Sequence, residues 1–203
     1  MFSAVLVVSA LLWSLAPQEE AVSGGAGWAR GPVRWLMLPA EEKQWRKLES
    51  EEQFSSFIQG FWTRRSGPGD RGENPKRTAF HKRVAEADLL FEGEGTVGSL
   101  TNRGRAYLLL GPPSELVQNY RNSPDLSAGS GSPIRRAGSQ RFLEETWSWR
   151  PEDLGPDLQK EMSRKRWRVD LVVRFEVAGD RHILRGGEEL LRLAARAWVE
   201  DSR

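Results

Sequence analysis

Apolar residues at helical spacing mark the first half of the chain. Residues 50–53 (SEEQ) have the form of a capping box, in which a serine and a glutamine three positions later bond each other's backbone N–H groups. Five apolar residues follow at positions i, i+3, i+4, i+7 and i+8, namely Phe54, Phe57, Ile58, Phe61 and Trp62. This spacing predicts an amphipathic helix that buries its aromatic face in the core.

Weaker patterns on either side of that segment predict two more helices. Pro39 favours the start of a helix over residues 40–48, because the first turn of a helix tolerates proline. A third helix is expected from residue 75 to residue 91, with an apolar stripe made of Phe80, Val84, Ala87 and Phe91. Residues 35–38 (WLML) are expected to form a short strand or an arm lying on the core, and residues 66–74 a loop.

Residues 98–115 (GSLTNRGRAYLLLGPPSE) are predicted to form a turn, a strand and a stop. Asn102 and Gly104 favour a turn, since glycine adopts positive φ freely and asparagine tolerates it. Residues 105–110 are a short apolar run, which we interpret as the strand. The Gly-Pro-Pro sequence at 111–113 ends it, because proline has no N–H to give to a ladder.

Alternation of apolar and polar residues predicts strands in the second half. Residues 142–149 and 167–178 alternate with a period of two, which indicates strands with one buried and one solvated face. Gly179-Asp180 suits a two-residue turn into a return strand at 181–185. Residues 114–120 are expected to form either a short helix or an edge strand.

The order of these elements predicts an α+β fold. Helices come first and strands later, so we expect N-terminal helices packed on a small, mainly antiparallel sheet, closed by an amphipathic helix over 188–201. The 203 residues, of which 38% are hydrophobic, suit a single domain over 40–203 with a lead-in arm at 24–39. Residues 122–140 are rich in Ser, Gly and Pro and are expected to form a mobile loop, with a substrate lid as the alternative.

The N-terminal apolar run points to export. Residues 2–16 (FSAVLVVSALLWSLA) would span about 22 Å as a helix, which is short of the hydrocarbon core of roughly 30 Å. We therefore favour a secretory signal peptide over residues 1–23, and the alternative is an uncleaved membrane anchor. Under both interpretations the domain lies outside the cytoplasm, in the periplasm or the medium.

Composition narrows the possible chemistry. The chain has no cysteine, which excludes disulfides, thiolate metal sites and cysteine nucleophiles, and it has only two histidines, His81 and His182. The Gly-rich residues 92–101 lack the strand-before, helix-after context of a phosphate-binding loop. We therefore predict no cofactor, no metal and no catalytic residue. The net charge of +2, with acidic residues interspersed, disfavours nucleic acid as a partner.

Two aromatic residues and two histidines leave alternatives open. Trp147 and Trp149 lie two positions apart, so they form either an exposed platform for sugar or peptide or part of the buried face of the sheet, which we favour. We interpret His81 as a histidine at the edge of the core rather than a catalytic base. Glu145 is expected on the face of Trp147, where a buried ion pair with Arg105 on a neighbouring strand is the simplest account.

The succession of these segments resembles the GWxTD domain family, which comprises bacterial, mostly exported proteins of uncharacterised function. The resemblance covers about residues 35–178. The FWxRRD segment of the family corresponds to residues 61–66, and its GWxTD signature to residues 98–102, where Ser99 and Asn102 replace tryptophan and aspartate. The resemblance implies no activity or cofactor. The candidate functional or structural signature consists of Arg64, Arg65, His81, Gly98, Thr101, Asn102, Arg103, Gly104, Arg105, Tyr107, Gly111, Pro112, Pro113, Glu115, Glu145 and Trp147.

Two functions are compatible with this sequence. The first is a non-enzymatic interaction module whose partner is another envelope or secreted protein, with membrane contact only through an uncleaved N-terminal segment. The second is a hydrolase of an envelope polymer that uses carboxylates such as Glu115, Glu144 or Glu145 with a nearby arginine. Glycoside hydrolysis requires two carboxylates roughly 5–10 Å apart across a cleft. We favour the interaction module, since turn residues beside a strand need no chemistry to explain them.

Overall fold

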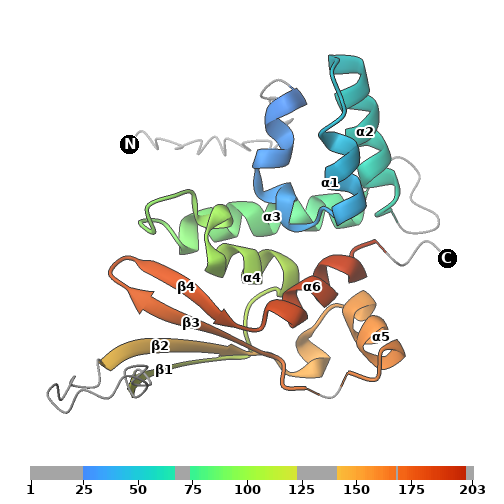
Figure 1. Cartoon of the computed structure of the whole chain (residues 1–203). Coiled ribbons are helices and arrows are strands. Elements are labelled where there is room, and N and C mark those ends of the chain that lie inside the picture. Colours follow the sequence, from blue (N-terminus) through green and yellow to red (C-terminus); the bar gives the residue numbers. More distant parts are fainter. Residues whose placement is uncertain (1–24, 67–73, 123–140, 168, 200–203) are drawn as a thin grey trace, which may run out of the picture.

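The computed structural model describes residues 25–66, 74–122, 141–167 and 169–199. Within them, helices are stacked over one face of a four-stranded antiparallel sheet, and no described helix lies on the other face (Figure 1). The α+β class is confirmed, with the last helix following the sheet. The predicted signal segment lies outside the described residues, as do all but the end residues of the loop predicted at 66–74 and all but the first residue of the loop predicted at 122–140.

The first half of the chain is helical, as expected. The capping box before α2 is confirmed, because Gln53 N–H donates to Ser50 Oγ and Ser50 N–H donates to Gln53 Oε1, both at 3.3 Å. Phe54, Phe57, Phe61 and Trp62 are all buried. The elements are η1 (Gly25–Arg30), η2 (Pro32–Trp35), α1 (Pro39–Trp45), α2 (Glu51–Thr63) and α3 (Pro75–Leu90).

The lead-in before α1 contains no strand. The prediction of a strand at 35–38 is wrong, because η2 is a short 3-10 helix that ends at Trp35 and the residues after it turn into α1. Leu36 and Met37 are nevertheless buried against the helices, so this segment is an arm that lies on the core. The indole Nε1 of Trp35 donates to the carbonyl of Ser99 (2.9 Å), which joins the arm to a segment 64 residues away.

The second half consists of a 3-10 turn, a buried helix, four strands and flanking helices. The helix α5 lies beside the sheet, and α4 and α6 lie directly on it (Figure 1). The elements are η3 (Gly98–Leu100), α4 (Asn102–Leu110), β1 (Glu115–Asn122), β2 (Arg141–Ser148), η4 (Pro151–Asp153), α5 (Pro156–Arg164), β3 (Val172–Ala178), β4 (Arg181–Gly186) and α6 (Glu188–Ala197).

The predicted strand at 105–110 is wrong, because these residues form the helix α4. Thr101 is its N-cap, and its Oγ1 accepts from Gly104 N–H at 2.9 Å. Gly111 ends the helix with φ +82°, a backbone conformation that favours glycine. Residues 106–110 are all buried, since α4 lies between the sheet, α3 and α6. A helix buried on every side has the same continuous apolar run as a buried strand, so periodicity does not separate the two.

The sheet has the order β1-β2-β3-β4, with every neighbouring pair antiparallel. The predicted strand at 142–149 and the hairpin turn at Gly179-Asp180 are confirmed, and residues 114–120 belong to an edge strand rather than a helix. The strand β3 begins at Val172 instead of residue 167. Trp167 N–H donates to the carbonyl of Met162, so the chain is still leaving α5 at that point.

The aromatic face of β2 is part of the core. Trp147 and Trp149 are 2% and 4% exposed, which confirms the buried interpretation over an exposed platform. The ring of Phe175 on β3 lies 5.3 Å from that of Trp147, and Phe91 at the end of α3 lies 5.7 Å from it. Burying aromatic rings of this size supplies much of the driving force for packing the helices on the sheet.

A buried ion pair joins the arm, α1 and α2. Arg65 is fully buried, and its guanidinium donates to both oxygens of Glu41 (3.0 and 2.8 Å) and to the carbonyls of Leu36 and Phe61. Burial opposes ionisation of Glu41, but the hydrogen bonds from Arg65 and from Leu38 N–H outweigh it and hold the pKa of Glu41 below its ordinary value of 4.5. Arg64 adds an exposed contact to the same carboxylate (2.9 Å).

We expect Glu41 to stabilise the fold at neutral pH and to lose this effect in acid. A carboxyl group with a lowered folded-state pKa stabilises the fold above its unfolded-state pKa and loses that contribution as the pH falls through the folded-state pKa. Glu41→Gln should therefore lower the free energy of unfolding by about 3 kcal/mol at pH 7. The difference from the unsubstituted chain should shrink below pH 4.5 in urea titrations. The neighbouring control Glu42→Gln, in an exposed pair, should change little at any pH.

Candidate functional site

Close backbone packing explains the glycines of the signature. A Cβ on Gly98 would overlap the carbonyl oxygen of Ala87 on α3, and a Cβ on Gly104 would overlap the carbonyl oxygen of Gly98. The backbones of α3, η3 and α4 therefore touch, which only glycine permits. Ser99 is fully buried, and its N–H donates to Asp88 Oδ1 (2.7 Å). These residues hold α4 in place.

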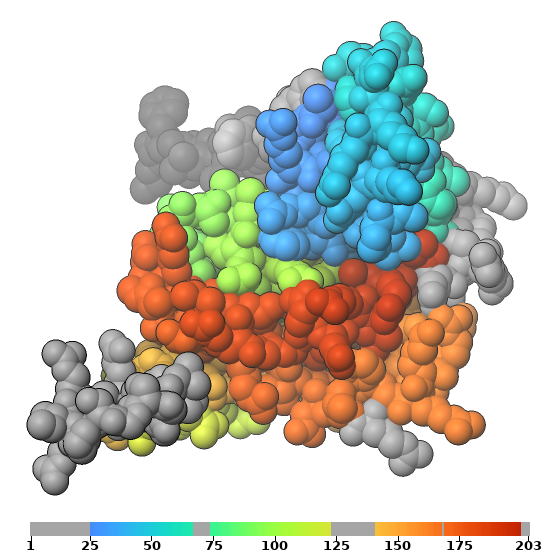
Figure 2. Space-filling view, in the orientation of Figure 1, coloured from blue at the N-terminus to red at the C-terminus, as the bar shows by residue number. Residues whose placement is uncertain are grey.

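The start of α4 contacts the edge strand β4. Asn102 Nδ2 donates to the carbonyl of His182 (2.9 Å), and His182 N–H donates to Glu94 Oε2 (3.3 Å). The backbone N–H and C=O of His182 therefore point away from β3, in the plane of the sheet. A fifth strand would otherwise bind them there. Figure 2 shows the green surface around the start of α4 in contact with the orange surface of β4. We call β4 the occupied edge.

Two buried carboxylates lie behind this contact. The Glu94–Glu145 cluster comprises Glu94, Arg103, Glu145 and His182. Arg103 donates to Glu94 at 2.6 Å and lies 3.6 Å from Glu145, and the two ring nitrogens of His182 lie 3.6 Å from Glu94 and Glu145. Glu145 is 1% exposed, and its oxygens accept from Trp147 Nε1 (2.8 Å) and Gln118 Nε2 (2.7 Å). A carboxylate so enclosed and so fully bonded stabilises the fold and has no face for a substrate.

The strand β1 is the opposite edge of the sheet and is open. Ser114 N–H donates to the carbonyl of Ser148, so the backbone groups of Ser148 point toward β1. Those of its register partner Glu115 therefore point toward β2. Successive residues of an antiparallel strand direct their backbone groups to opposite sides. The N–H and C=O groups of Leu116, Gln118 and Tyr120 therefore point outward, with no described element beside them. We call β1 the open edge.

The open edge is long, regular and partly apolar. All eight residues of β1 are exposed, including Leu116 (50%), Val117 (37%) and Tyr120 (70%). The register with β2 runs over all eight residues without a shift, whereas β3 and β4 have a bulge at Arg174/Phe175. Proteins protect exposed edges with bulges, prolines, lysines or covering elements. The strand β1 has no bulge, proline or lysine, and no described element covers it.

The other predicted site residues lie apart from this edge. Arg105 pairs with Glu188 (2.8 and 2.9 Å), so its predicted pairing with Glu145 is wrong, because Arg105 lies on a helix that turns it toward α6. These hydrogen bonds hold the pKa of Glu188 below its ordinary value. Tyr107 donates to Glu86 (2.9 Å), and burial together with this bond raises the pKa of Tyr107. The ring of His81 packs against that of Trp62 on α2 and not against the members of the cluster.

The proposed hydrolytic carboxylates are not brought together. Glu144 and Glu145 are successive residues of β2 and therefore lie on opposite faces of the sheet. Glu144 pairs with Arg121 (3.0 Å), and Glu115 lies exposed at the start of β1, two residues after Pro113. No observation places two of these three carboxylates across a cleft.

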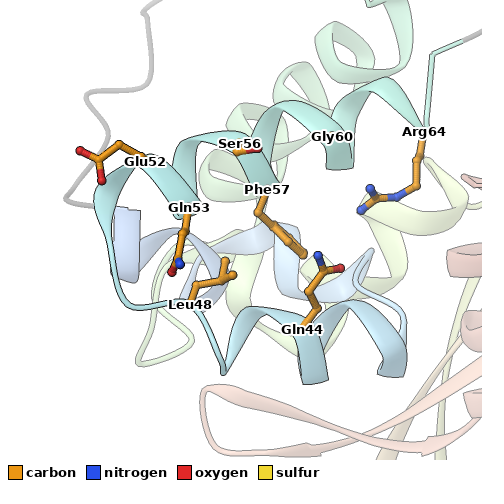
Figure 3. A pocket seen from close by; sticks show the side chains of 8 residues that line it. All are labelled: Gln44, Leu48, Glu52, Gln53, Ser56, Phe57, Gly60 and Arg64. Carbon is orange, nitrogen blue, oxygen red and sulfur yellow. The ribbon is translucent and has the colours of Figure 1, made fainter.

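A groove of about 410 Å³ lies between α1 and α2, away from the signature on α4. Phe57 and Leu48 lie at its centre, Glu52 at one end and Arg64 at the other (Figure 3). Arg64 already forms an ion pair with Glu41, so its charge is balanced by a carboxylate of the protein itself. Within the described ranges, no group of three acidic, histidine or cysteine side chains is arranged to hold a metal ion. None of the helices in those ranges is long and apolar enough to cross a membrane.

Comparisons with protein-family models, with curated proteins and with solved structures find no match for this chain. The resemblance to the GWxTD family therefore stays a prediction that rests on the quoted motifs.

Sequence reasoning missed Glu94, Gln118 and His182 as partners of the signature. Glu94 and His182 are 88 residues apart. The sequence pattern predicts a Gly-rich connector around Glu94 and a return strand around His182. A weak signal existed: an isolated glutamate between glycines at 93 and 95, and a single polar histidine on the apolar face of a strand. Neither pattern predicts which residue is the hydrogen-bond partner of Glu94 or of His182.

Arg103 and Arg105 should differ sharply in their contribution to stability. Arg103→Gln leaves two carboxylates, with side chains 5% and 1% exposed, without their cation and should cost about 3–5 kcal/mol. The matched control Arg105→Gln disrupts a pair with Glu188, which is 38% exposed, and should cost about 1 kcal/mol. Urea titrations of the two variants measure the difference. Equal losses would show that the Glu94–Glu145 cluster does not depend on Arg103.

Proposed function

We propose that this chain is a non-enzymatic protein-interaction module that binds an extended segment of another protein at the open edge β1. Strand addition of this kind takes its affinity from main-chain hydrogen bonds and its specificity from alternate side chains. The observation that carries the proposal is the contrast between the two edges. The backbone groups of His182 on β4 are bonded by Asn102 and Glu94, whereas no described element binds the outward groups of Leu116, Gln118 and Tyr120 on β1.

The side chains of β1 suit a protein partner. Those of Leu116, Gln118 and Tyr120 point to the same face as the helices, opposite Trp147, Glu145 and Leu143 on β2. Leu116 and Tyr120 are nevertheless exposed, because the helical layer does not extend over β1. A partner strand at this edge would find apolar contacts from Leu116 and Tyr120, while the side-chain amide of Gln118 between them donates to Glu145.

Export and the lack of an enzymatic role are further parts of this proposal. Export is supported only by the apolar run at 2–16, and it makes an envelope or secreted protein the natural partner. A non-enzymatic role is supported by the enclosure of Glu145 and by the separation of the acidic residues that a hydrolase would use.

Site-specific photo-crosslinking in cells tests strand addition. A photoreactive phenylalanine analogue replaces Leu116, Gln118 or Tyr120 in separate variants. An added strand repeats every two residues, so the three probes should link to positions of one partner segment that are two residues apart. Mass spectrometry of the linked peptides measures this spacing.

The exposed Val169, which lies before β3, provides the matched control position. A probe there should not link to the same segment. Crosslinks from β1 that scatter over unrelated peptides, or that equal those from residue 169, would contradict a strand-binding edge.

A further inference from the structure

We propose that the segment that binds β1 is the β1 strand of a second copy of this chain, so that two sheets join into one eight-stranded sheet. This inference rests on the proposed function and names its partner. It follows from the sequence of β1 (ELVQNYRN), which is complementary to itself when read in the antiparallel direction.

Symmetry limits how the two strands can pair. Residues directly opposite each other in an antiparallel pair point to the same face of the sheet. In a symmetric dimer, the two-fold axis is perpendicular to the sheet and lies between the two strands. It must then pass midway between the two copies of one residue, so that this residue lies opposite itself. The outward-facing backbone groups of Leu116, Gln118 and Tyr120 must also meet their equivalents in the second copy, which a central axis at Gln118 achieves.

This register pairs complementary side chains. Glu115 lies opposite Arg121 of the second copy, and Leu116 opposite Tyr120 of the second copy, each pair occurring twice. Arg121 already pairs with Glu144 of its own copy (3.0 Å), so Glu115 would be a second carboxylate beside the same guanidinium. Among the described residues, no cation lies within ion-pair distance of Glu115, so its charge is available. Gln118 meets Gln118 of the second copy at the axis. Aromatic–aliphatic and opposite-charge pairs across strands stabilise antiparallel pairing.

Neighbouring registers lack this match. An axis at Asn119 places Val117 opposite Arg121 and Leu116 opposite Asn122. An axis at Val117 places Glu115 opposite Asn119 and Leu116 opposite Gln118. Of these registers, only the one centred on Gln118 pairs Glu115 with Arg121 and Leu116 with Tyr120, and it places Val117 opposite Asn119.

The fold leaves room for this arrangement. The axis puts both helical layers on the same side of the joined sheet, and β1 is the strand that neither layer covers. The two copies of β1 would then form a strip about 10 Å wide between the layers, at the usual strand spacing of about 4.8 Å. Leu116 and Tyr120 of both copies would line that strip.

A cysteine at the axis tests the register directly, because the natural chain has no cysteine. In the proposed pair, the Cα atoms of residue 118 lie about 5.5 Å apart, within the range that a disulfide spans. The whole chain carrying Gln118→Cys should form a disulfide-linked dimer under mild oxidation. The controls Asn119→Cys, one residue along, and Val169→Cys, at an exposed site elsewhere, should stay mainly monomeric.

Sedimentation equilibrium of the same chain without cysteine provides an independent measurement. The unsubstituted chain should show a concentration-dependent monomer–dimer equilibrium. Leu116→Lys places a lysine opposite Tyr120 twice per dimer and should raise the dissociation constant roughly tenfold or more. Val169→Lys should leave it unchanged.

Three results would overturn the inference: a monomer at every concentration, a dimer unaffected by Leu116→Lys, or equal disulfide yields at residues 118, 119 and 169. The proposed function fails separately. If the chain is monomeric but the probes on β1 link at two-residue spacing to another protein, only the second copy is excluded as the partner. If the probes on β1 also link no better than one at residue 169, strand addition itself is wrong.

Discussion

An open antiparallel sheet leaves a row of backbone N–H and C=O groups unpaired on each of its two edge strands, and this constraint organises the molecule. Along β4, Asn102 and Glu94 bind the outward groups of His182, so side chains occupy that edge at this residue. Along β1 no described element does the same. The signature residues at the start of α4 therefore bind one edge of the sheet, and the opposite edge is the surface that we propose for binding.

The contact at His182 depends on residues that are far from it in sequence. Asn102 is directed at β4 because α4 begins at that point, and α4 is fixed there by the close approach of Gly98 and Gly104 and by the Thr101 cap. Glu94 is held by Arg103 from the same first turn of α4. The first turn of α4 therefore supports β4, and the glycines and polar residues of the signature have a shared structural reason.

Local patterns in the sequence predict much of this fold, and long-range contacts account for the rest. The capping box at Ser50, the aromatic stripe of α2 and the alternation in β2 and β3 report burial of one face, which periodicity reveals. The helix α4 was mistaken for a strand because it is buried on every side and loses its periodicity. Thr101 as an N-cap residue and Gly111 at the end are the local signals for a helix. Asn102 and Gly104 between them favour a turn just as well, which is why the sequence pattern predicts a turn and a strand.

The candidate site was only half visible from sequence for a similar reason. Arg103, Asn102 and Glu145 stood out through their motifs, but their partners Glu94 and His182 come from a connector and an edge strand. Pairing Arg105 with Glu145 failed once Arg105 moved from a strand to a helix, because a helix presents residues 103 and 105 in different directions. The open state of β1 depends on which strand is outermost. The sequence offers an edge strand at 114–120 only as one of two alternatives, because its pattern does not exclude a short helix.

Backbone amide hydrogen exchange in a dilute, monomeric sample, followed residue by residue by NMR, tests the unequal edges most directly. The amide of His182 should be protected by Glu94, and the inward amides of Val117 and Asn119 should be protected by β2. The outward amides of Leu116, Gln118 and Tyr120 should exchange at rates close to those of an unstructured peptide. Protection of these three amides equal to that of Val117 and Asn119, or rapid exchange at His182, would contradict the account.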